Sequence, residues 1–85
     1  MSKKQSRTFE ITQEVTNYAT VGSTSLMPIS GDIYIWYGDF TGDAAALAAT
    51  GMPIPQGALL EPYKSHDGII HMRSVVGTVV MHEVV

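Results

Sequence analysis

The residues that could do chemistry in this sequence are three histidines and a group of aspartates. His66, His71 and His82 could bind a metal ion, because imidazole is a common metal ligand. However, no two of them have HxH or HxxxH spacing, and the chain has no cysteine to complete a thiolate zinc site. We therefore predict no metal site, and interpret the histidines as surface or half-buried rings that are hydrogen-bonded.

Four aspartates, Asp32, Asp39, Asp43 and Asp67, each lie beside a glycine. Two of them could act as the carboxylate pair of a glycoside hydrolase, and residues 39–43 (DFTGD) could offer oxygen ligands to calcium. That segment lacks the alternating ligands and the closing glutamate of a calcium loop, and aspartate next to glycine is typical of turns. We predict that these aspartates build turns.

Sequence motifs of catalytic or cofactor sites are also missing. The chain has no GxSxG nucleophile elbow, no phosphate-binding loop and no GxGxxG dinucleotide signature. We therefore predict that the protein is not an enzyme and that it uses no cofactor.

The composition points to a surface that other molecules cover. Charged residues make up 15% of the 85 residues, against about 25% in a typical soluble domain. A plain soluble monomer of low charge is the alternative. A net charge of −3 argues against nucleic acid as a partner, and no apolar run approaches the ~20 residues of a membrane span. Basic residues gather near the start, at Lys3, Lys4 and Arg7.

The clearest element is a strand over residues 33–37 (IYIWY), because all five residues are β-branched or aromatic and glycines bound it. Tyr34 and Trp36 share one face, while isoleucines occupy the other, so both faces are apolar. Such a strand is either covered on both sides or offers one face to a partner. The aromatic residues could instead form a core or a platform for carbohydrate.

The other elements are short strands and one helix. Residues 43–50 predict a helix with Asp43 as N-cap and Gly51 after its end, and Pro53 and Pro55 exclude a central strand. Strands are predicted over residues 8–16, 19–21, 58–63, 69–73 and 74–85, with a turn at 65–68 and a bulge or close backbone approach at Gly77. The fold class is therefore all-β: a sandwich or barrel of about six to eight short antiparallel strands with one helical loop insertion. Residues 1–7 are predicted to be a flexible arm, and residues 8–85 one domain.

Three segments carry a resemblance to a known group of proteins. They are residues 34–38 (YIWYG), 51–57 (GMPIPQG) and 77–84 (GTVVMHEV), which are a strand ending in an aromatic before glycine, a proline-rich turn and a closing strand. In this order they resemble small bacteriophage β-domain structural proteins. That resemblance implies a capsid decoration (cement) protein of the virion, forming a homotrimer and bound to the major capsid protein.

Two alternatives stay open beside the decoration protein: a phage tail, fibre or neck accessory protein, and a small module that binds carbohydrate or a host surface. For the partner interface we predict the basic arm, three aromatic strand positions and the alanine-rich loop. The residues are Lys3, Lys4, Arg7, Phe9, Tyr34, Trp36 and Leu47.

Overall fold

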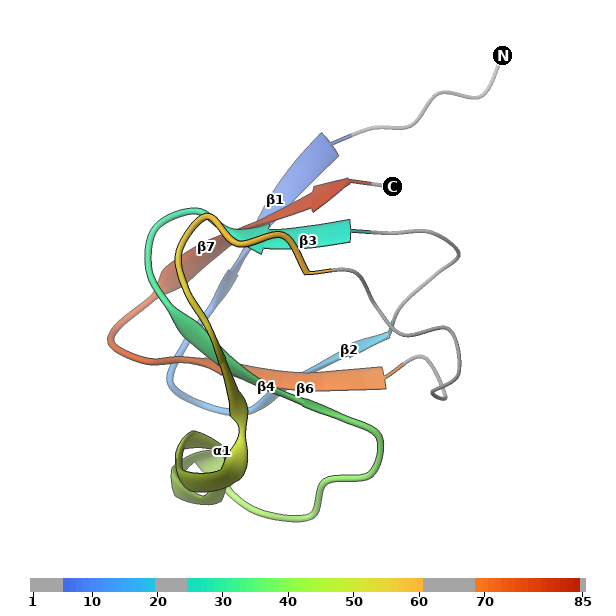
Figure 1. Ribbon diagram of the computed structural model, residues 1–85, viewed down its shortest axis with the longest axis vertical. Coiled ribbons are helices and arrows are strands. Elements are labelled where there is room, and N and C mark those ends of the chain that lie inside the picture. The colour runs from blue at the N-terminus through green and yellow to red at the C-terminus, as the bar shows by residue number, and fades with distance from the viewer. Residues whose placement is uncertain (1–5, 20–24, 61–68, 85) are drawn as a thin grey trace.

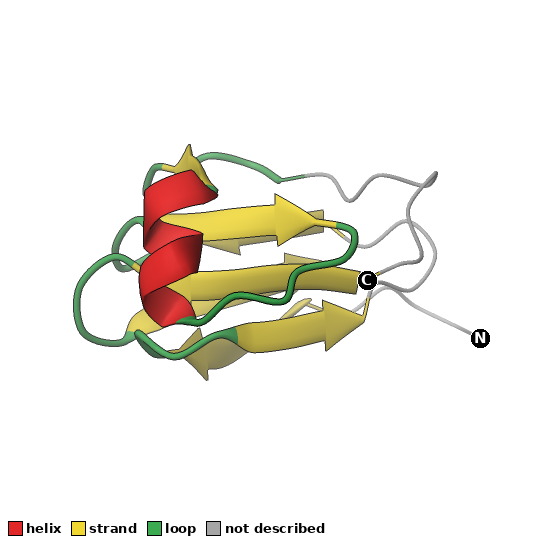
Figure 2. Cartoon of the chain, turned by 90° about the horizontal axis from the view of Figure 1, so that it is seen from below, coloured by secondary structure: helices red, strands yellow, loops and turns green. Residues whose placement is uncertain are grey.

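The structure is a computed structural model that describes residues 6–19, 25–60 and 69–84. Within these residues the chain forms two antiparallel sheets packed face to face, with one short helix below them (Figures 1 and 2). The elements are β1 (Ser6–Ile11), β2 (Thr16–Ala19), β3 (Ser25–Pro28), β4 (Ile33–Tyr37), α1 (Ala44–Thr50), β5 (Met52–Ile54), β6 (Ile69–Ser74) and β7 (Val79–Val84). The predicted all-β class is confirmed, and the two separate sheets make it a sandwich rather than a barrel. Among the described residues, no helix combines the length and the apolar character needed to cross a membrane.

The two sheets have a simple order. The three-stranded sheet runs β1-β7-β3, and the four-stranded sheet runs β2-β6-β4-β5. Chain neighbours β1 and β2 are therefore edge strands of different sheets, and β6 and β7 are inner strands of different sheets. Each short loop between such a pair carries the chain from one layer to the other.

The core fills the space between the layers. Alternate residues of each strand point inward, as the pleat of a strand requires. Its buried members are Ile11, Leu26, Ile33, Ile35, Leu60, Ile70, Met72, Val79 and Met81. Deleting several methyl or methylene groups from such a site typically costs about 2 to 5 kcal/mol.

The connection from β6 to β7 differs from the prediction. A strand was expected over residues 74–85, but β6 continues through Ser74 and β7 begins only at Val79. Gly77 has φ +62°, a left-handed conformation that favours glycine, and the Ser74 hydroxyl donates to its carbonyl oxygen. The valines before Gly77 favour a strand locally, but the turn lets the chain change sheets.

The proline-containing segment forms an edge strand. β5 pairs only with β4 among the described residues, with Ile33 opposite Ile54 and Tyr34 opposite Pro53. An antiparallel ladder alternates hydrogen-bonded and non-hydrogen-bonded pairs. The Ile35 carbonyl lies close to Gly51 on the β5 side, which makes the Tyr34–Pro53 pair a non-hydrogen-bonded one. The missing N–H of Pro53 therefore costs the ladder nothing.

The predicted helix is confirmed, but the reason for its closing glycine differs. The Asp43 carboxylate accepts the N–H of Ala46 at 2.9 Å, as an N-cap does. Gly51 donates its N–H to the Leu47 carbonyl at 2.7 Å, yet its φ is −73° and not left-handed. A Cβ at this position would lie 2.5 Å from that same carbonyl oxygen. Glycine is needed here for space.

Several predicted boundaries change. The strand expected over residues 8–16 is divided into β1 and β2 by a corner, and β1 begins at Ser6, so Ser6 and Arg7 belong to the sheet and not to the arm. Of the strand expected over 58–63, Leu60 forms a single bridge to Leu26. Residues 1–5, 20–21, 61–63 and the 65–68 turn lie outside the described residues.

Candidate functional site

A group of ring side chains crosses the outer face of the four-stranded sheet. Trp36 of β4 lies opposite His71 of β6, which in turn lies opposite Asn17 of β2. Phe40, in the loop after β4, packs against both rings, with its centroid 6.0 Å from that of Trp36 and 5.7 Å from that of His71. We call Asn17, Trp36, Phe40 and His71 the Trp36 cluster.

Hydrogen bonds hold the Trp36 cluster in place. His71 Nδ1 lies 2.7 Å from Asn17 Oδ1, and because an amide oxygen can only accept, Nδ1–H is the donor. The Trp36 indole N–H donates to the Asp39 carbonyl at 3.0 Å, which ties the loop to the strand. Gly38, with φ +83°, makes the sharp bend between them. Trp36 remains 37% exposed.

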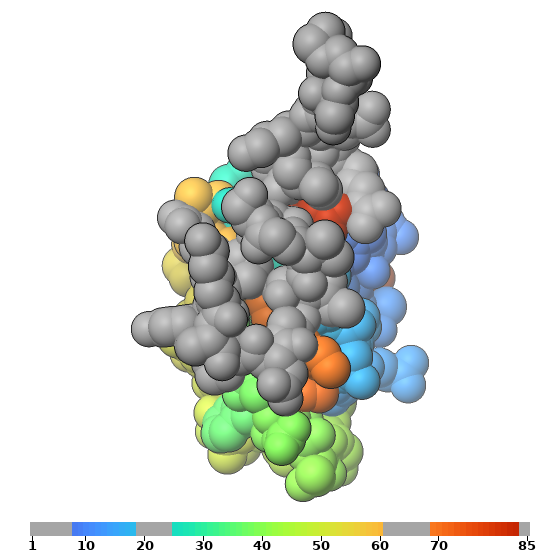
Figure 3. Space-filling view, turned by 90° about the vertical axis from the view of Figure 1, so that its right-hand side faces the viewer, coloured from blue at the N-terminus to red at the C-terminus, as the bar shows by residue number. Residues whose placement is uncertain are grey.

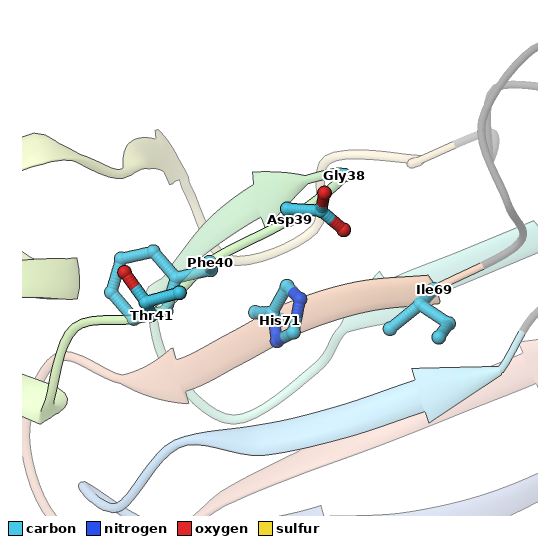
Figure 4. A pocket seen from close by; sticks show the side chains of 6 residues that line it. All are labelled: Gly38, Asp39, Phe40, Thr41, Ile69 and His71. Atoms are coloured by element: carbon cyan, nitrogen blue, oxygen red, sulfur yellow. The ribbon is translucent and has the colours of Figure 1, made fainter.

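A shallow pocket of about 270 Å³ opens beside this cluster (Figure 4). The loop side contributes Asp39, Phe40 and Thr41, and β6 contributes Ile69 and His71. In the space-filling view the loop after β4, the start of β6 and β2 lie side by side at the lower end of the molecule (Figure 3). The pocket thus combines the Phe40 and His71 rings and the Ile69 side chain with the polar residues Asp39 and Thr41.

The rest of this face is covered by the helix. α1 packs against β4 and β6, and Figure 2 shows it lying across the strands. The Arg73 guanidinium donates to the Ala44 carbonyl at 2.9 Å and lies 5.9 Å from the centre of the Tyr34 ring. The second apolar face of β4 is therefore covered largely by the chain itself, and its existence does not require a partner subunit.

The outer face of the three-stranded sheet is different. Inward-facing Val79, Met81 and Glu83 are buried, so the alternate residues of β7 and their cross-strand neighbours face outward. These outward residues are Thr8, Glu10, Met27, Val80 and His82. The helix α1 packs against β4 and β6 of the other sheet, and Figure 1 shows it on the opposite side of the sandwich. We call these five residues the open face.

The histidines and aspartates considered as metal ligands or catalytic residues either lie far apart or form structural hydrogen bonds. His71 and His82 were placed on adjacent strands, but β6 and β7 lie in different sheets and the two rings belong to opposite outer faces. Asp32 Oδ1 accepts the Gln56 N–H at 2.8 Å, and Asp43 caps α1. Among the described residues, no three His, Cys, Asp or Glu side chains gather as a metal site would require.

The predicted interface residues do not form one surface. Phe9 stacks on Tyr18 at a ring separation of 5.5 Å, at the β1/β2 side of the sandwich, whereas Tyr34 and Trp36 lie on the outer face of the four-stranded sheet. Lys3 and Lys4 lie outside the described residues, and of Arg7 only the backbone is described.

Leu47 was predicted to lie at the partner interface, but its side chain is not on the surface of the chain. Leu47 is fully buried, because α1 turns it against the sheet. Met27, Phe40 and His71 were not among the residues predicted for the partner interface. Met27 and His71 have cross-strand neighbours from distant segments, and Phe40 packs both on nearby Trp36 and on distant His71.

Comparisons of the chain with protein-family models, with curated proteins and with solved structures found no match.

Proposed function

We propose that this chain is a non-enzymatic structural protein that works by attaching to other proteins. The observation that carries the proposal is the difference between the outer faces of the two sheets. The chain lays α1 and the loop with Phe40 over its four-stranded sheet, while the open face lies on the side of the sandwich away from α1. Among its five residues, Glu10 is the one permanent charge, and Met27 and Val80 are half-buried hydrophobics. Flat, charge-poor sheet faces suit protein contacts.

Within that class we propose a decoration subunit of a bacteriophage head, bound to the major capsid protein. The support is the resemblance of residues 34–38, 51–57 and 77–84. These segments contain Gly38, Gly57 and Gly77, the described glycines that have positive φ. The pattern therefore describes turns that this sandwich needs. Because it binds only the assembled shell, such a subunit would stabilise the shell by mass action.

Location in the particle tests this proposal and separates it from a tail or fibre protein. Particles from the source would be disrupted, heads and tails separated on a density gradient, and the chain traced with an antibody. We expect it with heads, at a constant ratio to the major capsid protein. Recovery with tails would support the accessory alternative, and absence from both fractions would refute a virion role.

A pair of methionine variants tests the open face. Met27→Lys places a charge in that face, whereas Met52→Lys places one on β5, where the methionine is already 47% exposed. We expect Met27→Lys to weaken binding to decoration-free heads at least tenfold and Met52→Lys to leave it unchanged, with both variants folded by circular dichroism. Equal binding by both variants would exclude the open face as the contact.

The carbohydrate-module alternative has less support. It requires a flat platform from Tyr34 and Trp36, but the Arg73 guanidinium lies over the Tyr34 ring. Trp36 is tilted 49° to Phe40. The covered Tyr34 ring and the tilted Trp36–Phe40 pair therefore do not form the coplanar surface on which a sugar ring stacks.

A further inference from the structure

The two long sides of the sandwich differ in how their edge strands are protected. On one side, β5 carries Pro53 and is followed by Pro55, and β3 is bridged by Leu60. On the other side lie the edge strands β2, with four residues, and β1, with six; neither contains proline or lysine, and β1 is the longer. Proteins usually protect a long edge strand, because its free backbone groups pair readily with another strand.

The hydrogen-bond alternation identifies the free groups on β1. The Val80 carbonyl accepts the N–H of Ile29, on the β3 side of β7. The alternate residues of β7 therefore face β1, and the register joins Met81 to Phe9 by hydrogen bonds. Thr8 and Glu10 must then direct their N–H and C=O groups away from the sheet. Within the described residues nothing bonds to those groups.

We propose that β1 pairs antiparallel with the β1 strand of a second copy of this chain, about a two-fold axis at Thr8. Such an axis places outward-facing Thr8 opposite Thr8 of the second copy as a hydrogen-bonded pair. It also places Glu10 opposite Ser6, so that no like charges meet, and it joins two three-stranded sheets into one of six strands, a common sheet size. The strand is thus its own complement, as an isologous contact requires.

A second copy also covers apolar surface that is otherwise half exposed. Phe9 and Tyr18 stack where the two sheets meet at this side of the sandwich. Both rings are only partly buried in the single chain. A strand added to β1 lies directly beside Phe9 and takes part of this pair out of water. The inference needs only the β1 edge and is independent of the virion assignment, and it departs from the trimer that the resemblance implies.

Single cysteines test the register directly, because the chain has no cysteine of its own. In the proposed dimer the two Thr8 Cα atoms lie about 5.5 Å apart, within disulfide range. The two Glu10 Cα atoms lie about 14 Å apart, from four residues of strand rise. We expect Thr8→Cys to form a disulfide dimer under mild oxidation and Glu10→Cys to remain largely monomeric. Equal cross-linking of both variants, or of neither, would overturn the register.

Proline variants test the edge itself. At Thr8 the N–H faces away from the sheet, so Thr8→Pro removes a donor for a partner strand and none for the fold. Ser74 donates its N–H to the Thr12 carbonyl, so Ser74 and the alternate residues of β6 direct their backbone groups toward β2. In the β2–β6 register the Ala19 N–H then points away from β6, which makes Ala19→Pro the matched control.

Light scattering after size exclusion, over a range of concentrations, reads out both variants. For the unmodified chain and for Ala19→Pro we expect a mass twice that of the 9.2 kDa chain. For Thr8→Pro we expect dissociation at a concentration at least tenfold higher. A monomer or trimer for the unmodified chain, or a dimer that Thr8→Pro leaves intact, would refute the proposal. If Thr8→Pro does not fold, the cysteine pair decides.

Discussion

Asp32 and Asp43 show how single ionisable side chains stabilise this fold through hydrogen bonds to the backbone. Each uses one carboxylate oxygen to accept a backbone N–H, from Gln56 and from Ala46 respectively. His71 likewise donates to Asn17 across two strands. These hydrogen bonds lie at exposed positions, and in each the partner is a structural group. Residues that could have been catalytic are therefore occupied in holding turns, a helix end and a strand pair.

Gly77 is the residue at which backbone conformation matters most in the change of sheet. Because its φ is +62° and a Cβ there would meet no atom within 4 Å, Gly77→Ala should destabilise the protein through backbone strain alone, by about 1 kcal/mol. Gly77→Asn should cost less, because asparagine tolerates the left-handed region. Urea unfolding measures both. A stabilising Gly77→Ala would show that the turn is not left-handed in solution.

At the scale of elements, α1 and the loop before it form a cover for the four-stranded sheet. The helix has only seven residues, too few to be stable alone, so it depends on Leu47 beneath it and on Arg73, which binds its first turn. The loop depends on Phe40 against Trp36 and on the indole hydrogen bond to the Asp39 carbonyl. The cover explains why a strand with two apolar faces can exist in a single chain.

Two aspartates at the ends of this loop make a matched test of the cover. Asp43→Ala removes the N-cap of α1 and should lower the free energy of unfolding by about 1 kcal/mol. Asp39→Ala should change it by less than about 0.5 kcal/mol, because the backbone carbonyl of Asp39, and not its carboxylate, accepts the indole N–H. Urea denaturation compares them. Equal losses would mean that the cap contributes little to holding α1.

At the scale of the whole molecule, the sandwich has a face covered by α1, an open face and a long unprotected edge strand, β1. The proposed attachment uses the open face, and the proposed self-association uses the edge at β1. A six-stranded sheet made of two copies would present two open faces side by side. This arrangement enlarges the surface on which a shell of capsid proteins could bind.

Two N-terminal deletions test how β1 contributes to the whole. Because β1 begins at Ser6, removing residues 1–5 should leave thermal unfolding unchanged and weaken binding to heads, if Lys3 and Lys4 form part of the contact. Removing residues 1–11 should unfold the domain, since it removes an entire strand together with buried Ile11. Circular dichroism melting measures both. Full binding after the short deletion would exclude the basic arm as a contact.

The sequence by itself determined the local elements. The β-branched and aromatic run 33–37 is a strand, the capped alanine run is a helix, and Pro53 lies in an edge strand, β5. Each outcome depends on residues a few positions apart. The tertiary structure decided what lies against what. Asn17 meets His71 across 54 positions of sequence, and Phe40 packs against His71. The change of sheet between Ser74 and Val79 overrides a locally strand-like run. Pairing and covering depend on burial summed over the whole molecule, which no short window of sequence contains.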